Sequence, residues 1–235
     1  MSDFAGAARR ELEAERRNRE DVPVPSVQAV LFDFGGVFMA SPFAAVRVFA
    51  AGLGLAPERV VEIVFGAYDR DTDHPWHRLE RGEVSLADAR QAIFDLAAPG
   101  HRIDLFEALG SLRDTSIRED VIALARHTRA LGVKTAIVTN NVREFGDGWR
   151  AMLPVDELFD VVVDSAHVGV RKPDPRIFRL ALERLGVGAP ERAVFLDDFH
   201  GNIAAAERLG MRGILVAEDH RPAMERLRAL LAALP

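Results

Sequence analysis

The stretch AVLFDFGGVF, residues 29–38, decides the fold that we predict for this chain. Its first four residues form an unbroken apolar run, which is typical of a short strand buried on both faces of a sheet. The run ends directly at Asp33, and a carboxylate at the end of a buried strand is costly unless another group uses it. Gly35 and Gly36 follow, and glycines let the backbone turn sharply and approach a ligand closely. By itself the stretch fits either an ordinary Asp-Gly turn or a functional site.

The later part of the chain repeats this pattern of apolar runs that end in polar residues. From residue 117 onward such runs alternate with segments of helical period, which predicts a parallel sheet with right-handed crossovers. We therefore predict an α/β fold with a Rossmann-like parallel sheet of five strands, or slightly more. The strands expected after the first span residues 133–138, 159–165, 193–198 and 213–217. Residues 141–153, between the second and third strands, are expected to be helical.

Three regions of the chain differ in composition and period. Residues 1–26 are dense in Arg and Glu and are expected to form a charged leader, either a solvated helix or disordered. Residues 43–116 have helical period and no convincing strand, which predicts a helical domain inserted after the first strand. Residues 27–42 and 117–235 then form the α/β core.

The composition is that of a soluble, cytoplasmic protein. The 235 residues carry a formal net charge of −6, which argues against nucleic acid or an anionic membrane as the main partner. There is no cysteine, so disulfides, thiolate catalysis and Cys-ligated metal centres are excluded. No apolar run approaches the roughly 20 residues that span a bilayer, and no signal-peptide core is present. We expect a small molecule as the partner; the oligomeric state does not follow from the sequence.

Polar side chains follow the predicted strands at the points where they end, and parallel strands gather such ends at one ligand-binding edge. Three carboxylates without a histidine or cysteine ligand suit Mg²⁺. A hydroxyl at a helix start suits phosphate, and a lysine neutralises charge near an anionic substrate. An Asp carboxylate can itself attack phosphorus, so the set predicts phosphoryl transfer. The residues are Asp33, Thr139, Asn140, Lys172, Asp197 and Asp198.

Four short segments, FDFGGV, IVTNN, RKPDP and FLDDFHGN, resemble in this order the four motifs of the haloacid dehalogenase superfamily. The resemblance covers roughly residues 27–220, and the order of the four motifs makes it specific. Three segments, FDFGGVF...SPF, WHRLERGE and VGVRKPDP, are together most similar to the subgroup around the phosphatase domain of soluble epoxide hydrolases. The resemblance implies that residues 43–116 form a cap domain.

The resemblance also implies a metal site. Asp33 would be both the nucleophile and a metal ligand, and Gly35 would offer its backbone carbonyl to Mg²⁺. Asp198 would bind Mg²⁺ directly, and Asp197 would orient a metal-bound water. These four residues are our predicted metal ligands.

The same resemblance implies a phosphate site. Thr139 and the Asn140 amide would hold the phosphoryl oxygens, and Lys172 would bridge Asp33 and the phosphate. Gly36 is counted among the substrate-binding residues, and Asn202 is expected to steady the loop around them.

One position departs from the family pattern. Family phosphatases usually carry a second Asp two residues after the nucleophile as general acid and base, and here that position is Gly35. General acid–base help is typically worth 10²–10⁴-fold, so its loss predicts a steep dependence of rate on leaving-group pKa. His74, His77 and His200 are candidate substitutes, although we expect His74 and His77 to be surface residues.

The sequence therefore predicts a Mg²⁺-dependent phosphatase that acts on a small phosphomonoester through an aspartyl-phosphate. Two alternatives stay open. A non-catalytic binding protein with the same fold is favoured by Gly35, whereas a metal-independent 2-haloacid dehalogenase is disfavoured by the acid pair at 197–198. The substrate cannot be read from the sequence, because cap side chains set it.

Overall fold

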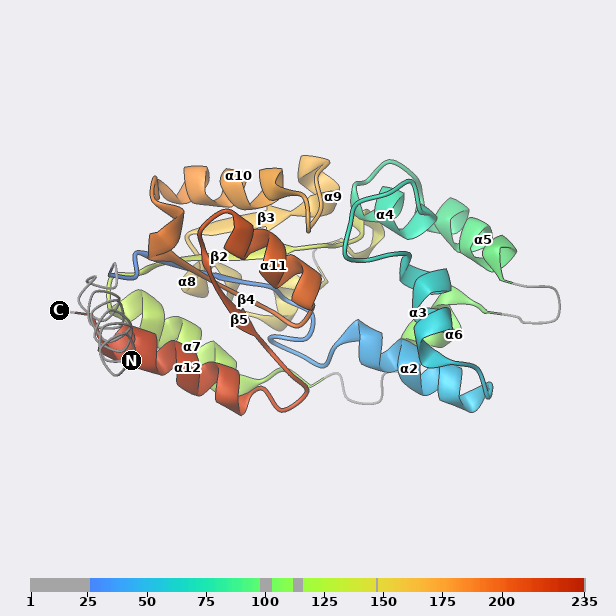
Figure 1. Ribbon diagram of the computed structural model, residues 1–235, viewed down its shortest axis with the longest axis horizontal. Coiled ribbons are helices and arrows are strands. Elements are labelled where there is room, and N and C mark those ends of the chain that lie inside the picture. The colour runs from blue at the N-terminus through green and yellow to red at the C-terminus, as the bar shows by residue number, and fades with distance from the viewer. Residues whose placement is uncertain (1–25, 98–102, 112–115, 147, 235) are drawn as a thin grey trace, which may run out of the picture.

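The computed structural model describes residues 26–97, 103–111, 116–146 and 148–234. Its centre is a five-stranded, fully parallel sheet in the order β3-β2-β1-β4-β5 (Figure 1). The predicted α/β fold with a five-stranded parallel sheet is therefore confirmed. The strands are β1 (Ala29–Phe32), β2 (Lys134–Thr139), β3 (Val161–Asp164), β4 (Ala193–Asp197) and β5 (Arg212–Leu215).

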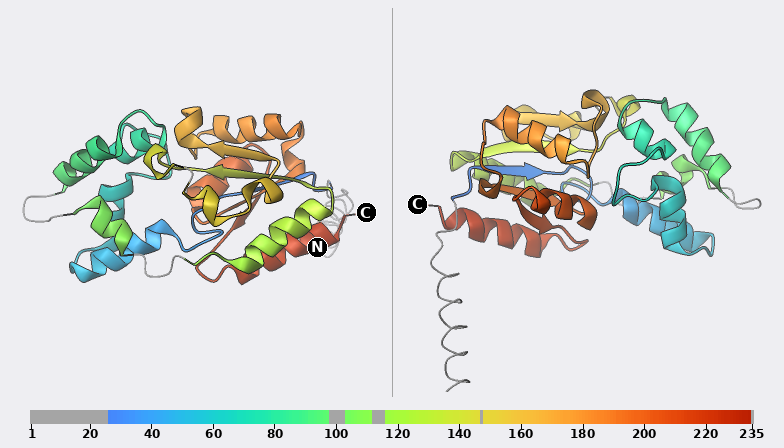
Figure 2. Two further views of the ribbon diagram at one scale, coloured as in Figure 1. Left: turned by 180° about the vertical axis from the view of Figure 1, so that it is seen from behind. Right: turned by 45° about the horizontal axis from the view of Figure 1, so that its top comes forward.

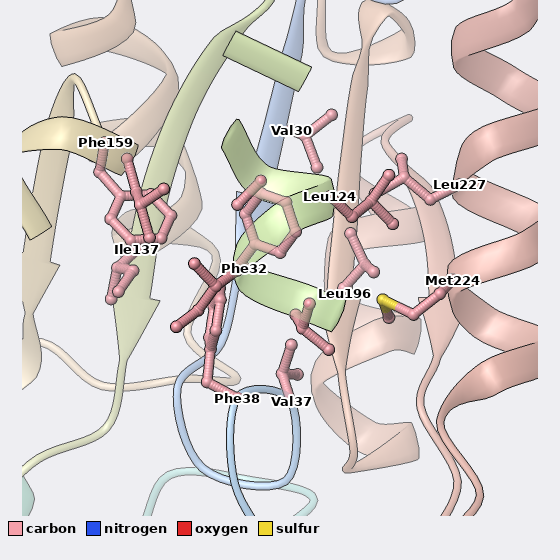
Figure 3. Packing of buried hydrophobic residues seen from close by; sticks show 14 of the residues in the cluster. Val30, Phe32, Val37, Phe38, Leu124, Ile137, Phe159, Leu196, Met224 and Leu227 are labelled. Atoms are coloured by element: carbon pink, nitrogen blue, oxygen red, sulfur yellow. The ribbon is translucent and has the colours of Figure 1, made fainter. Parts of the chain in front are cut away.

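Helices cover both faces of the sheet, which explains the continuous apolar runs in its strands. Val30 and Phe32 of β1 point to a cluster shared with α7 (Glu119–Ala130) and α12 (Arg221–Ala232), as Figure 3 shows. Ala29 and Leu31 point to the opposite cluster, under α10 and α11. Successive side chains of a strand alternate between faces, so β1 must be apolar at every position. The helices on that second face are α10 (Pro175–Leu185) and α11 (His200–Arg208).

Local capping fixes where helices begin and end. The Asp174 side chain accepts a hydrogen bond from the Arg176 N–H, Pro175 occupies the first turn, and Gly186 ends α10 at φ 70°. Ser85 caps α5 by accepting from the Asp88 N–H. Short helices complete the core: α8 (Val155–Leu158), α9 (Ser165–Val168) and the 3₁₀ turn η3 (Pro190–Arg192).

In the described residues between β1 and α7, five helices form a second body with its own apolar cluster. It lies beyond the carboxyl ends of the strands, at one end of the long axis (Figures 1 and 2). The two bodies touch through aromatic rings: Phe43 stacks on Phe199 of the core with ring centroids 5.3 Å apart. The helices are α2 (Pro42–Gly52), α3 (Pro57–Phe65), α4 (Pro75–Glu80), α5 (Leu86–Leu96) and α6 (Leu105–Gly110).

The prediction of a helix over residues 141–153 is wrong. In its described residues, 141–146 and 148–153, this connection holds two 3₁₀ turns and no α-helix: η1 (Arg143–Phe145) and η2 (Arg150–Met152). Gly146 adopts φ 54°, a left-handed conformation that interrupts an α-helix. The charged leader expected at 1–26 lies outside the described residues except for Ser26. No helix in the described part of the chain is both long enough and apolar enough to cross a membrane.

Candidate active site

Asp33 is placed by the end of β1. Its backbone N–H donates to the Leu196 carbonyl at 2.8 Å, which continues the pairing of β1 with β4. Its Oδ1 accepts a hydrogen bond from the Phe34 N–H at 2.7 Å, so the carboxylate is oriented by its own turn. The residue is 8% exposed and lines a cavity of about 430 Å³. The sheet thus delivers one oriented, nearly buried carboxylate to an open space.

Lys172 bridges two of the carboxylates. Its Nζ lies 2.7 Å from Asp33 Oδ1 and 2.7 Å from Asp197 Oδ2. Burial lowers the pKa of Lys172, but Asp197 and Asp33 more than compensate, so the pKa is raised above its ordinary value and the ammonium stays charged. Lys172 lies behind Asp33 and does not line the cavity. Its contacts are therefore with the nucleophile predicted from the sequence and with Asp197.

Asp33, Asp197 and Asp198 form an acidic cluster in which one oxygen from each lies within 4.8 Å of the others. Burial raises the pKa of Asp33 well above its ordinary range; Lys172 opposes the rise and the two neighbouring carboxylates add to it. Burial and the Asp197 charge raise the pKa of Asp198 to about 7, against a hydrogen bond from Ser41. Because burial is the largest cause of both rises, the ionised carboxylates favour a proton or a further cation beside Lys172.

The predicted metal ligands fit a divalent cation. Three carboxylates face one ammonium, and hard oxygen ligands are what Mg²⁺ prefers. Gly36 gives the Asp198 carboxylate the space it occupies, because a Cβ at position 36 would lie 2.2 Å from Asp198 Cγ. Its φ of 74° also favours glycine. Asp197 accepts hydrogen bonds from the Phe199 N–H at 2.7 Å and from Asn202 Nδ2 at 3.0 Å. Asn202 thus holds the Asp197 carboxylate, in agreement with its expected role.

Thr139 and Asn140 lie at the end of β2 and both line the cavity, yet their side chains are used differently. The Thr139 hydroxyl has only a long contact, 3.4 Å, with the Asn140 carbonyl. The Asn140 side chain donates to Tyr68 Oη and to the Lys172 carbonyl, and it accepts from the Lys172 N–H at 2.7 Å. Its two amide hydrogens are therefore used by protein groups, and this side chain fixes the loop that carries Lys172.

Gly35 lines the cavity, and a Cβ there would meet only Pro42, at 3.4 Å. The expectation that His74 and His77 are surface residues is wrong for His77, which is fully buried in α4. Its Nδ1 accepts from the Thr72 N–H, and burial with the Arg171 charge lowers its pKa to about 3. Neither these two histidines nor His200 lines the cavity. The structure therefore brings none of the candidate substitutes to the site.

A buried ion pair joins the core to the second body of helices α2–α6, called the cap from here on. This pair was not predicted from the sequence. Arg171, next to Lys172, is fully buried, and its Nε donates to Glu80 Oε2 at 2.6 Å. Tyr68 donates to Glu80 Oε1 at 2.7 Å, and the Arg171 guanidinium lies 4.5 Å from the Tyr68 ring centroid. Through Asn140, this group of Tyr68, Glu80 and Arg171 contacts the end of β2. Arg171 lies in RKPDP and Glu80 in WHRLERGE, but nothing in either segment pairs them.

The family of haloacid dehalogenase-like hydrolases matches residues 27–210. The chain is 34% identical over 213 residues to acyl-CoA dehydrogenase family member 10 of Mus musculus, covering 88% of this chain and 19% of the relative. It is 36% identical to mouse bifunctional epoxide hydrolase 2 over 43% of this chain and 19% of the relative. The chain thus spans about a fifth of the length of these two relatives. The predicted resemblance to the superfamily and to the epoxide hydrolase subgroup is confirmed.

Two further comparisons cover nearly the whole of the other protein. Sesquiterpene phosphatase astK of Aspergillus oryzae is 28% identical, over 84% of this chain and 94% of that protein. An HAD-family enzyme of Bacteroides thetaiotaomicron, solved as a complex with magnesium and inorganic phosphate, superposes with a TM-score of 0.57. It is 19% identical and covers 83% of this chain and 96% of that one, so it shows the shared fold.

Proposed function

The chain belongs to the haloacid dehalogenase-like hydrolases, and we propose that it is a Mg²⁺-dependent phosphatase acting on a small-molecule phosphomonoester. The observation that carries the proposal is the buried Asp33, oriented by Phe34, paired with Lys172 and open to the cavity. A phosphatase among the relatives that match nearly end to end supports it.

In the first step, an Asp33 carboxylate oxygen bonds to phosphorus while the ester P–O bond breaks, giving an aspartyl-phosphate and the free alcohol. Burial raises the pKa of Asp33, and Lys172, 2.7 Å away, opposes that rise and so favours the ionised nucleophile. The Thr139 hydroxyl, which has no short protein contact, donates to a phosphoryl oxygen. With glycine at position 35, the departing oxygen takes its proton from water. In the second step, water attacks phosphorus, releases phosphate and restores Asp33.

Mg²⁺, when bound by Asp33, Asp198 and the Gly35 carbonyl, would neutralise phosphoryl charge. Asp197 faces both Lys172 and Asn202 and completes the acidic cluster. This cluster disfavours the dehalogenase alternative, because haloacid chemistry has no need of it. The non-catalytic alternative rests on Gly35 alone.

The test is hydrolysis of a panel of phosphate esters, with Mg²⁺ and with chelator, by the native chain and by Asp33→Asn. We expect turnover that needs Mg²⁺ and is lost in Asp33→Asn, with unchanged circular dichroism as the control for folding. Equal turnover in chelator, or an active Asp33→Asn variant, would contradict the mechanism. Chloride release from a 2-haloacid without Mg²⁺ would favour the dehalogenase alternative. Mg²⁺ binding without turnover of any ester would favour the binding protein.

A further inference from the structure

The cavity in front of Asp33 is much larger than a phosphate group. Its volume of about 430 Å³ lies within the range of sites that enclose drug-sized ligands. Asp33, Thr139 and Asp198 lie at the sheet edge that bounds it, so the remaining space belongs to the alcohol part of a substrate. Apolar side chains from both bodies line that space: Met39, Phe43, Phe65, Trp76, Val142 and Trp149.

Most of the polar side chains that line this space are already paired with protein groups; among the described residues, Trp76 Nε1 and Asn202 Oδ1 are buried without a hydrogen-bond partner. Tyr68 donates to Glu80 and accepts from Asn140, and Glu80 also accepts from Arg171. Asn141 Nδ2 donates to Asp164 at 2.7 Å. A substrate with several hydroxyl or amine groups would outnumber these two atoms and would have to break one of the bonds or leave a group unpaired. An unpaired buried polar group costs about 1–3 kcal/mol.

The cavity also lacks a partner for a second anionic group. Among the residues that the structure describes, no lysine, arginine or histidine lines it. A nucleotide with further phosphates, or a substrate with a carboxylate, would bring negative charge beside Asp33, Glu80 and Asp198. Burying an unpaired charge there is far more costly than burying a hydrocarbon.

Two large apolar side chains remain exposed where the cavity meets solvent. Phe145 is 44% exposed and Met152 is 39% exposed, and both line the cavity. They come from η1 and η2, the connection that replaces the helix expected between β2 and β3. Apolar surface at a pocket entrance is stabilised when an apolar ligand covers it.

We propose that the natural substrate is a monophosphate ester of an apolar alcohol or phenol, whose hydrocarbon part fills this cavity and contacts Phe145 at its entrance. The inference rests on the proposed phosphatase function and adds the class of substrate. It disfavours sugar phosphates, nucleotides and phosphorylated amino acids, because among the described residues the cavity has no cation for a second charge and few free partners for several polar groups.

The test is kcat/KM with Mg²⁺ for phenyl phosphate and a series of 4-n-alkylphenyl phosphates up to octyl. The alkyl group lengthens away from the phosphate and leaves the leaving-group chemistry nearly constant. Each fully buried methylene is worth about fourfold, so we expect kcat/KM to rise at least tenfold over the series. Phosphotyrosine, the same aryl ester with a charged tail, should react no faster than phenyl phosphate. A flat series, or a preference for phosphotyrosine, would overturn the proposal.

A matched pair of variants places the effect in the cavity. Phe145→Ala should lower kcat/KM for 4-octylphenyl phosphate about tenfold and change that for phenyl phosphate by less than about twofold. Leu131, 45% exposed at the end of α7 and outside the cavity, is the control: Leu131→Ala should change neither. Equal effects of Phe145→Ala on both esters would count against the proposed contact.

Measuring the binding of ligands that cannot be hydrolysed tests the apolar cavity independently of the phosphatase function. Calorimetry with 4-alkylbenzylphosphonates, which cannot be hydrolysed, measures the apolar contact without chemistry. Affinity that rises with chain length, together with no turnover of any ester, would overturn the phosphatase function and support the apolar cavity. Affinity independent of chain length would overturn the cavity assignment even if esters are hydrolysed.

Discussion

The sheet edge and the cap form opposite sides of one cavity, and they are built from different chemistry. The sheet edge concentrates charge: three carboxylates and one ammonium lie at or beside strand ends, each held by a hydrogen bond or ion pair. The cap lines the cavity mainly with aromatic and aliphatic side chains. The sheet edge is thus suited to the reaction, and the cap to selecting the substrate. Figure 1 shows the cap helices α2–α6 set beyond the strand ends.

The largest effect should come from removing the charge at the sheet edge. Lys172→Met leaves Asp33 and Asp197 without their shared cation, so kcat should fall on the order of 10³-fold. Stability should fall by about 3–5 kcal/mol in urea unfolding without metal, because a buried ion pair loses one partner. Lys134→Met, at the exposed first residue of β2, is the control, and Lys134 is the only other lysine in the sequence. Comparable losses in the two variants would contradict the special role of Lys172.

The next largest effect should come from the buried Glu80–Arg171 ion pair, which joins the core to the cap. Glu80→Met removes the 2.6 Å partner of the buried Arg171 and leaves it only the weaker ion pair with Asp71, 3.6 Å away, so the free energy of unfolding should fall by about 3–5 kcal/mol. The double variant Glu80→Met/Arg171→Met should recover most of that loss, because it removes both charges. Glu62→Met, which breaks the exposed Arg59–Glu62 pair, should cost less than about 1 kcal/mol. A double variant as unstable as the single one would show that loss of the Glu80–Arg171 pair, and not the poorly compensated Arg171 charge, sets stability.

Adding a carboxyl group at the sheet edge tests what Gly35 lacks. A side chain fits there, since its Cβ would meet only Pro42 at 3.4 Å. Gly35→Asp should accelerate hydrolysis of esters with poor leaving groups about 10²-fold and flatten the dependence of rate on leaving-group pKa. Gly35→Ala adds the Cβ without the acid and should do neither. A native enzyme whose rate is already independent of leaving-group pKa would refute the missing-acid interpretation.

Replacing a glycine by alanine should have a smaller effect. Comparing Gly36→Ala with Gly132→Ala distinguishes the cost of backbone strain from the loss of space beside Asp198. Gly36 and Gly132 both have positive φ, 74° and 78°, so alanine at either position costs about 1–2 kcal/mol. Only at Gly36 does the new Cβ meet Asp198; at Gly132 nothing lies within 4 Å. Gly36→Ala should therefore also weaken Mg²⁺ binding, about tenfold by calorimetry, whereas Gly132→Ala should leave it unchanged. Equal Mg²⁺ affinities would place Asp198 outside the metal site.

The mildest test changes only pH and metal. The pKa of Asp198 is about 7 in the fold, and in an unfolded chain it returns to the ordinary Asp value near 3.8. The folded state then binds more protons between these values, so the metal-free protein should lose stability as pH rises from 4 to 7. Mg²⁺ needs the ionised form, so its gain in Tm over chelator should be larger at pH 8 than at pH 6. Asp198→Asn should reduce this difference, with Asp33, whose pKa is also raised, accounting for the rest. An equal gain at both pH values in the native chain would contradict the prediction.

The sequence predicted most of the sheet and its charged edge for a local reason. Each strand is a short apolar run, and the residue that follows it must lie at the carboxyl end of a parallel sheet. Asp33, Thr139 and Asp197 are therefore placed by their neighbours in the chain. The connection at residues 141–153 was mispredicted because its apolar spacing suits a helix, whereas Gly146 and the packing of Trp149 on Phe34, with ring centroids 5.2 Å apart, favour tight turns.

Only the tertiary structure decided what the cap does. Glu80 and Arg171 are 91 residues apart, and neither segment alone shows that they form a buried pair. The burial of His77, the use of the Asn140 side chain by the Lys172 loop and the apolar lining of the cavity likewise depend on how the cap rests on the sheet. Short-range patterns fix strands and their ends, but contacts between distant segments arise only when both bodies pack together. The sequence by itself thus determined the charged edge of the sheet, and the packing of the cap determined the apolar cavity beside it.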